Sequence, residues 1–172
     1  GEIPARLADI LYGFPALLLA ILFAAALGGS TWTAVMAIGI ATIPAFVRVA
    51  RAETLQVISQ PYVEAARLSG VGELTVARRH VWPNIAPAVW VQASVSFGIA
   101  ILSEAGLSFL GLGSGPDTPT WGRMLREAQD NLFSTPLLAL WPGLAVAIAT
   151  LGFNLLGDGL RDVLDPKLRE RA

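Results

Sequence analysis

Side chains that could perform chemistry are few in this chain, and they are not grouped as an active site requires. There is no cysteine and only one histidine, His80, so no thiolate nucleophile and no His and Cys ligand set for zinc is available. Hydroxyls at Ser94, Ser96, Ser103 and Thr150 lie in apolar segments that contain no His, Asp or Lys to activate them. We therefore expect no catalytic residue and no metal site, and an intramembrane enzyme is only a distant alternative.

The overall composition is that of a membrane protein. Of the 172 residues 54% are hydrophobic and only 15% are charged, and the mean hydropathy is +0.60. The net charge of -1 leaves no basic face that could neutralise phosphates. We expect lipid around the chain and no nucleic acid among its partners.

The uncharged segments predict an all-α, polytopic transmembrane protein with four spans in a single domain, residues 1–172. About 20 apolar residues cross a bilayer as a helix. The uncharged stretch from Asp9 to Arg48 is long enough for two crossings, and its turn is expected at Gly28 to Thr31, which places Pro44 near a span end. The expected spans are residues 10–27, 32–49, 83–103 and 136–156, with an inner loop at 50–82, an outer loop at 104–135 and a tail at 157–172.

Positive charges are distributed unequally between the two ends of these spans. Of the 12 Lys and Arg residues, all but Arg123 and Arg126 lie on the side of the 50–82 loop. Loops rich in Lys and Arg remain in the cytoplasm. The pattern therefore predicts that the 50–82 loop and the C-terminus are cytoplasmic.

A charged island, QPYVEAARLSGVGELTVARRHVWPN, covers Gln60 to Asn84. Pro61 suits a first helical turn, and Gly70 can take the left-handed conformation that ends a helix, so we predict a helix from Tyr62 to Ser69. A second short helix is expected from about Glu73 to His80. Two short helices joined by a glycine-containing turn would form a compact projection that another soluble protein could contact.

The spacing of this island resembles the EAA loop of the membrane-spanning subunits of binding-protein-dependent ABC importers. Glu64, Ala65 and Ala66 are followed after three residues by Gly70, and Pro83 closes the motif. In that family the first helix of the loop is the coupling helix, which rests in a groove of the ATPase subunit, where its Glu meets basic residues. The resemblance implies ATPase-coupling roles for Tyr62, Glu64, Ala65, Ala66, Arg67 and Gly70. His80 and Trp82 depart from the broad family, which usually has an aliphatic residue and Leu there.

Four further segments make the resemblance more specific, and together they cover essentially the whole chain. RLADILYGFPALLLA from Arg6, EAGLSFLGLG from Glu104, PTWGRML from Pro119 and FNLLGDGLRDVLDPK from Phe153 are similar to C-type permease subunits of the peptide, opine and nickel branch of ABC importers. A His at position 80 is common in this branch, whereas Trp82 remains a mild departure.

The resemblance to this branch implies a type I importer permease fold in a bacterial or archaeal cytoplasmic membrane. It implies as partners a second permease subunit, two cytoplasmic ATPase subunits, which bind the ATP so that this chain needs no cofactor, and an external solute-binding protein. Family members have six spans, so we expect that roughly the first third of the protein, with two spans, precedes this chain.

Short peptides are the expected substrates, and nickel or another small solute is the alternative within the branch. Peptides are favoured because no cluster of His, Met or Cys lines the spans. A membrane scaffold would share the hydrophobicity but would not explain an ATPase-docking loop. Glu104 has two interpretations: it lies near the outer mouth of a translocation pathway and meets the amino terminus of a peptide, or it caps the span at the interface.

The outer loop is predicted to contain an amphipathic helix. Trp121, Met124, Leu125, Ala128 and Leu132 recur at helical spacing on one side. We favour an anchor at the outer membrane surface, and docking of an external binding protein is the alternative.

Overall fold

The computed structural model describes residues 16–113, 115 and 117–164, and within these ranges the chain consists of helices and the turns that join them. The all-α prediction is confirmed. The elements are α2 (Ala16–Leu27), α3 (Thr31–Ile58), α4 (Pro61–Leu68), α5 (Glu73–Val76), the π-helical segment η1 (Ala77–Val81), α6 (Trp82–Phe109), α7 (Trp121–Asp130) and α8 (Leu137–Leu164).

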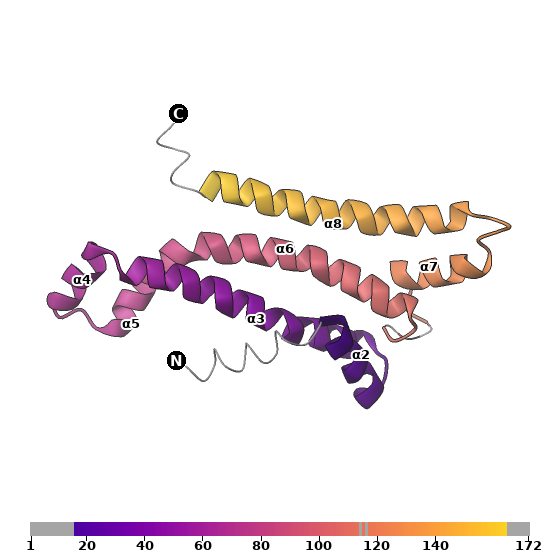
Figure 1. Ribbon diagram of the computed structural model, residues 1–172, viewed down its shortest axis with the longest axis horizontal. Helices are drawn as coiled ribbons and strands as arrows, with labels where there is room; N and C mark the ends of the chain where they lie inside the picture. Colours follow the sequence, from indigo (N-terminus) through magenta and orange to yellow (C-terminus); the bar gives the residue numbers. More distant parts are fainter. Residues whose placement is uncertain (1–15, 114, 116, 165–172) are drawn as a thin grey trace.

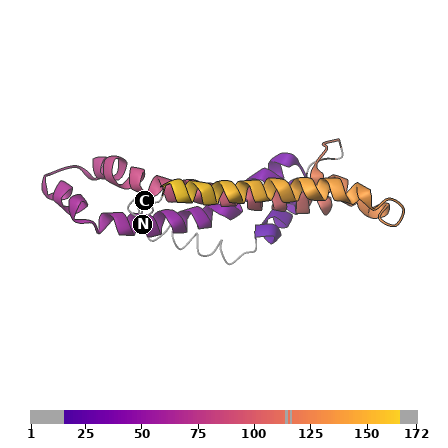
Figure 2. The same cartoon turned by 90° about the horizontal axis from the view of Figure 1, so that it is seen from above.

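Three long helices lie side by side and make an elongated molecule, with α6 between α3 and α8 (Figures 1 and 2). At one end α2 folds back on α3, and α7 packs against α6 and α8. At the other end α4 and α5 project beyond the three long helices. The α7 end and the α4–α5 end are therefore separated by the length of the long helices.

Within the described residues, three helices are long and apolar enough to cross a membrane: α3, the continuous helix over residues 73–109, and α8. The first expected span, 10–27, begins outside the described residues, and its described part is the short apolar helix α2. Most large apolar side chains of the long helices are exposed. Apolar surface on this scale requires lipid or another apolar chain around it, which fits a multi-pass membrane protein.

Helices α6 and α8 approach closely because small residues line their contact. A Cβ on Gly98 would lie 3.4 Å from the carbonyl oxygen of Thr150, and one on Gly157 would lie 3.3 Å from the Cβ of Ser94. The hydroxyl of Ser94 donates a 2.5 Å hydrogen bond to the carbonyl oxygen of Phe153. Close backbone approach and interhelical hydrogen bonds are the main forces that associate helices in lipid, where the hydrophobic effect does not act.

The amphipathic helix of the outer loop is present as α7, but part of its apolar face packs against protein. The Thr120 side chain caps its start by accepting a 3.2 Å hydrogen bond from the backbone N–H of Arg123. Ala128 is buried, whereas Trp121 and Met124 stay exposed. Because α7 packs against α6 and α8, it is part of the folded helix bundle and not only an anchor at the membrane surface.

The long helices extend further than the expected spans. Helix α3 continues to Ile58 instead of residue 49, so Pro44 lies in its interior and not near its end. Helix α6 continues past Glu104 to Phe109, and α8 continues through the first part of the tail to Leu164. A charged residue ends an apolar segment, but it does not interrupt the hydrogen bonds of a helix.

Candidate functional site

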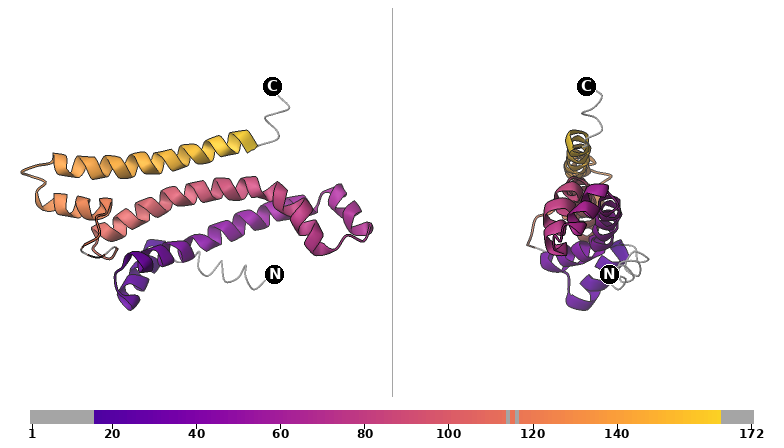
Figure 3. Two further views of the ribbon diagram at one scale, coloured as in Figure 1. Left: turned by 180° about the vertical axis from the view of Figure 1, so that it is seen from behind. Right: turned by 90° about the vertical axis from the view of Figure 1, so that its left-hand side faces the viewer.

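The residues of the EAA-like motif lie on α4, in the loop that joins α3 to α6. Glu64, Ala65 and Arg67 are exposed, Tyr62 is about half exposed and Ala66 is partly buried. This loop, residues 59–81, is called the projecting loop below, and it lies at the end of the molecule opposite α7 (Figure 3, left). The structure thus presents most of the predicted coupling residues on an accessible surface.

The ends of α4 follow from local sequence. Gln60 is extended and Pro61 occupies the first turn, where its missing N–H costs nothing. At the other end Gly70 has a φ of 79°, and the N–H groups of Gly70 and Val71 donate to the carbonyl oxygens of Arg67 and Ala66 at 3.0 and 3.2 Å. This pair of bonds is a Schellman motif, which requires a left-handed residue at the position of Gly70. Gly70 therefore directs the chain from α4 back toward α5.

A cluster of buried aliphatic side chains connects the projecting loop to both neighbouring helices. Val63 of α4 and Val76 of α5 are completely buried, and they pack with Val57 of α3, Val81 of η1 and Ile85 of α6. Removing one such side chain from a packed cluster is destabilising, because the vacated volume is only partly refilled. The cluster gives the projecting loop a fixed shape relative to α3 and α6.

An ion pair joins α4 to α5 across the glycine turn. The Nε atom of Arg67 lies 3.0 Å from Oε1 of Glu73, and its Nη2 atom lies 3.0 Å from Oε2. This two-point geometry is specific to a guanidinium and a carboxylate. Both side chains are well exposed, so the pair contributes to the orientation of α4 and α5 more than to stability.

The expected second short helix is not a separate element. Residues 73–81 are helical, but they continue without a break into α6 through the π-helical segment η1. Pro83 explains the π turn: it has no N–H to donate, and in a regular α-helix its ring would clash with the carbonyl group of Arg79. Widening the helix by one residue accommodates the proline without ending the helix.

The outward surface of the projecting loop combines an acidic group with apolar side chains. Within the described part of the chain, the carboxylate of Glu64 has no hydrogen-bond or ion-pair partner. Leu68 is 84% exposed and Leu74 is 74% exposed. An exposed leucine one turn from an unpartnered carboxylate on α4 suits contact with a partner that offers an apolar surface and a basic residue.

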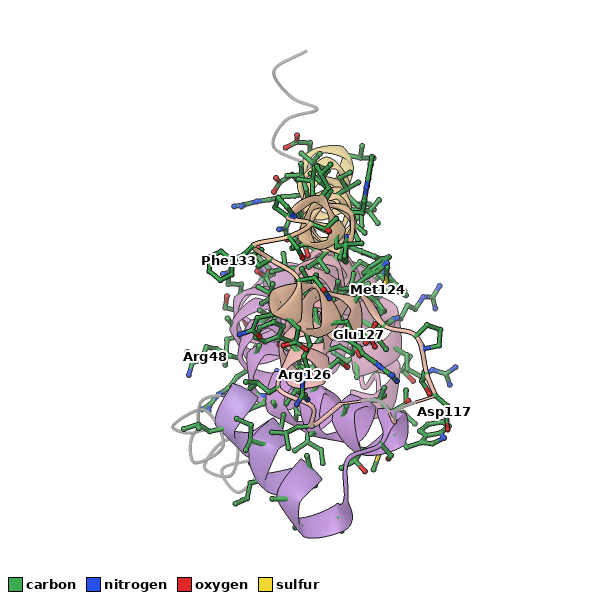
Figure 4. All side chains as sticks on the ribbon, turned by 90° about the vertical axis from the view of Figure 1, so that its right-hand side faces the viewer. Arg48, Asp117, Met124, Arg126, Glu127 and Phe133 are labelled. Carbon is green, nitrogen blue, oxygen red and sulfur yellow. The ribbon has the colours of Figure 1, made fainter. Side chains whose placement is uncertain are left out.

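Glu104 lies at the other end of the molecule. It is partly buried in α6, and its Oε1 atom accepts a 2.6 Å hydrogen bond from the hydroxyl of the buried Ser108. Nearby, a cavity of about 510 Å³ is lined by Gly29, Ser108, Gly111, Gly113, Gly115, Arg123, Arg126, Glu127 and Asp130. Figure 4 looks onto this end and shows that α7 contributes the side chains of Arg126 and Glu127. The structure does not bring Glu104 together with the predicted coupling residues.

Sequence reasoning missed two parts of the projecting loop. The buried Val63, Val76 and Val81 were not identified from the sequence, although apolar residues recur through this charged island. The ion pair between Arg67 and Glu73 was also missed, because the two residues are six positions apart across a turn and do not share a helix. In the described residues no group of three or more His, Asp or Glu side chains could hold a metal ion.

Comparison with known proteins identifies the family. The family model described as binding-protein-dependent transport system inner membrane component matches residues 3–170. Glutathione transport system permease proteins GsiD from Escherichia coli O1:K1 / APEC, Shigella flexneri serotype 5b (strain 8401) and Escherichia coli O157:H7 are each 44% identical to the chain over 164 residues, which is 95% of this chain and 54% of each relative. The chain therefore spans about half the length of these curated relatives. It belongs to the inner-membrane components of binding-protein-dependent transport systems, in the peptide, opine and nickel branch of ABC importers.

Proposed function

We propose that this chain is the part of an ABC importer permease that carries short peptides across the bacterial inner membrane and receives force from ATPase subunits through the projecting loop. The observation that carries this proposal is the exposed face of α4, where Glu64 has no partner among the described residues and Leu68 is almost fully exposed. A groove on an ATPase subunit would bury the side chain of Leu68, and a basic residue in that groove would pair with the carboxylate of Glu64. ATP would be bound and hydrolysed by that partner.

The distribution of charge supports a cytoplasmic position for the projecting loop. Among the described residues, six arginines belong to the loop or to the halves of the long helices nearest it, and two belong to α7 at the other end. The six are Arg48, Arg51, Arg67, Arg78, Arg79 and Arg161. Positively charged loops are retained in the cytoplasm, so this distribution favours the projecting loop and the end of α8 on the side where ATP is available.

The internal packing of the projecting loop supports a mechanical role. Val63 and Val76 hold α4 and α5 in one packed unit with the end of α3 and the start of α6. A push on α4 would therefore move both long helices rather than deform the loop. In this mechanism, closure of two ATPase subunits on ATP switches the spans between inward-open and outward-open arrangements.

The remaining partners and the substrate follow from the branch. A second permease subunit would cover part of the exposed apolar surface, and an external solute-binding protein would deliver the solute at the α7 end. The similar proteins from Escherichia coli and Shigella are named as glutathione transporters, and glutathione is a short peptide, so a peptide is favoured over nickel. Glu104 is proposed to lie near the outer mouth, with one carboxylate oxygen held by Ser108.

Charge reversal on α4 tests the coupling role. We expect Glu64→Lys, made in the full-length protein assembled with its partners, to lower glutathione-stimulated ATP hydrolysis and glutathione uptake about tenfold or more, because a lysine would repel the basic site on the ATPase. Asp158→Lys is the matched control, since Asp158 is exposed on the last turns of α8 and the charge change is the same. Unchanged coupling in the Glu64 variant would contradict the proposed function.

A further inference from the structure

The polar side chains of Tyr62, His80 and Asn84 lie together between α4 and the start of α6. The side-chain amide nitrogen of Asn84 lies 2.6 Å from the carbonyl oxygen of His80 and 3.4 Å from the hydroxyl oxygen of Tyr62. The rings of Tyr62 and His80 have centroids 6.0 Å apart and are tilted by 52°. Tyr62 belongs to α4, His80 to η1 and Asn84 to α6, so this polar joint connects three elements.

Asn84 lies in an irregular part of the backbone. Pro83 and Pro87 lack N–H groups, and both lie in the first turns of α6. The helix is π-helical just before this point, and the N–H of Trp82 donates to the carbonyl oxygen of Ala77, five residues earlier. Asn84 adds a short hydrogen bond from its side chain across this irregular turn.

The position of Tyr62 extends this local bond into a link between distant parts of the sequence. Asn84 and Tyr62 are 22 residues apart, and Tyr62 lies in the first turn of α4, two residues before Glu64. The tyrosine ring also contacts the His80 ring, so Tyr62 connects α4 to both η1 and α6. A rotation of α4 would therefore have to break these contacts or carry α6 with it.

We propose that Asn84 is a positioning residue that holds α4 at a fixed orientation to α6 through Tyr62 and His80, so that displacement of α4 is transmitted to α6. This role rests on the proposed function. The valine cluster supplies most of the packing energy on the inner side of the loop, whereas the polar joint lies on its exposed side and prevents α4 from turning about that cluster. Asn84 is exposed and touches no expected substrate or nucleotide site.

Matched substitutions test this role in the full-length protein, assembled with its permease and ATPase partners in proteoliposomes. Asn84→Leu removes the amide with little change in volume. We expect it to lower the amount of glutathione transported per ATP hydrolysed at least about fivefold, because one ordinary hydrogen bond contributes about that factor and this change removes two, while the ATPase subunits still copurify. Asn84→Gln keeps the donor and is expected to restore most of the ratio. Tyr62→Phe removes only the longer bond and is expected to lower the ratio less.

Asn131 provides the control because it makes the same kind of bond at the other end of the molecule. Its amide nitrogen lies 3.3 Å from the carbonyl oxygen of Glu127, four residues earlier, and it is also exposed. Asn131→Leu is expected to leave the ratio of transport to hydrolysis unchanged.

An unchanged ratio in Asn84→Leu, or an equal loss in Asn131→Leu, would overturn the role of the joint. Loss of coupling in Glu64→Lys without any loss in Asn84→Leu would overturn the positioning role of Asn84 and leave the proposed function standing. Normal coupling in Glu64→Lys would instead overturn the proposed function, and the two failures are therefore distinguishable.

Discussion

Gly122 shows how closely α7 approaches the backbone of α6. A Cβ at this position would overlap the carbonyl oxygen of Ala105 and lie 2.8 Å from its Cα atom. No flexible side chain is available to move aside, because the neighbouring atoms are backbone. Gly152 of α8 has no atom within 4 Å of the corresponding position. The two glycines therefore have different structural roles although both lie in helices.

Replacing Gly122 by alanine is expected to displace α7 from α6. Overpacking of a tight contact costs about 1–3 kcal/mol, so the midpoint of thermal unfolding of the detergent-solubilised protein should fall. Gly152→Ala is the control and should leave the midpoint unchanged or raise it slightly, because alanine favours a helix. Equal midpoints for Gly122→Ala and the unmodified protein would show that α7 does not depend on this contact.

At the level of single residues, the sequence predicts a feature when that feature depends only on neighbouring residues. The end of α4 at Gly70 could be predicted because only the neighbouring residues determine a left-handed turn. The contact of Asn84 with Tyr62 could not be predicted, since 22 residues separate them and the valine cluster determines how they meet. The same limit applies to Gly122, whose constraint comes from another helix.

At the level of helices, the arrangement of α4 and α5 was the hardest to predict, because it depends on contacts between side chains that no sequence pattern reveals. Hydropathy located the apolar parts of the long helices, but it could not show that α3 continues to Ile58 or that residues 73–81 join α6. Helical hydrogen bonds continue through charged residues, and the π-helical segment just before Pro83 takes the place of the break that a proline suggests. The ion pair between Arg67 and Glu73 also links α4 to α5 across the glycine turn.

Reversing the charges of this ion pair distinguishes a brace within the loop from a direct contact with a partner. Arg67→Glu alone is expected to increase hydrogen exchange of the backbone amides between α4 and α5 about twofold, as expected when an exposed ion pair is lost. The double variant Arg67→Glu/Glu73→Arg should return exchange, and transport per ATP, close to the original values because the pair is re-formed.

A double variant that regains slow exchange but not transport would contradict a purely internal role. Arg67 would then contact the ATPase directly. Failure of the single variant to change exchange would show that the valine cluster alone holds α4 against α5.

Over the whole molecule, the two ends differ in charge and in the kind of surface they present. The projecting loop offers Glu64 and exposed leucines, whereas the α7 end offers a polar cavity and the fully exposed Phe133 (Figure 4). The long helices between them are apolar over most of their surface. The family was predictable from short sequence motifs, and the general arrangement of helices was predictable from the apolar segments. The shape of each end was not, because it depends on contacts between elements.

The central claim, that the projecting loop meets the ATPase subunit, is tested most directly by crosslinking in the membrane. A photoreactive amino acid placed at position 68 of the full-length protein should form an adduct with an ATPase subunit, because Leu68 is exposed on α4. The same amino acid at position 133, which is even more exposed than position 68 and lies at the opposite end, should form none. An ATPase adduct from position 133, or its absence at position 68 in an actively transporting complex, would contradict the account.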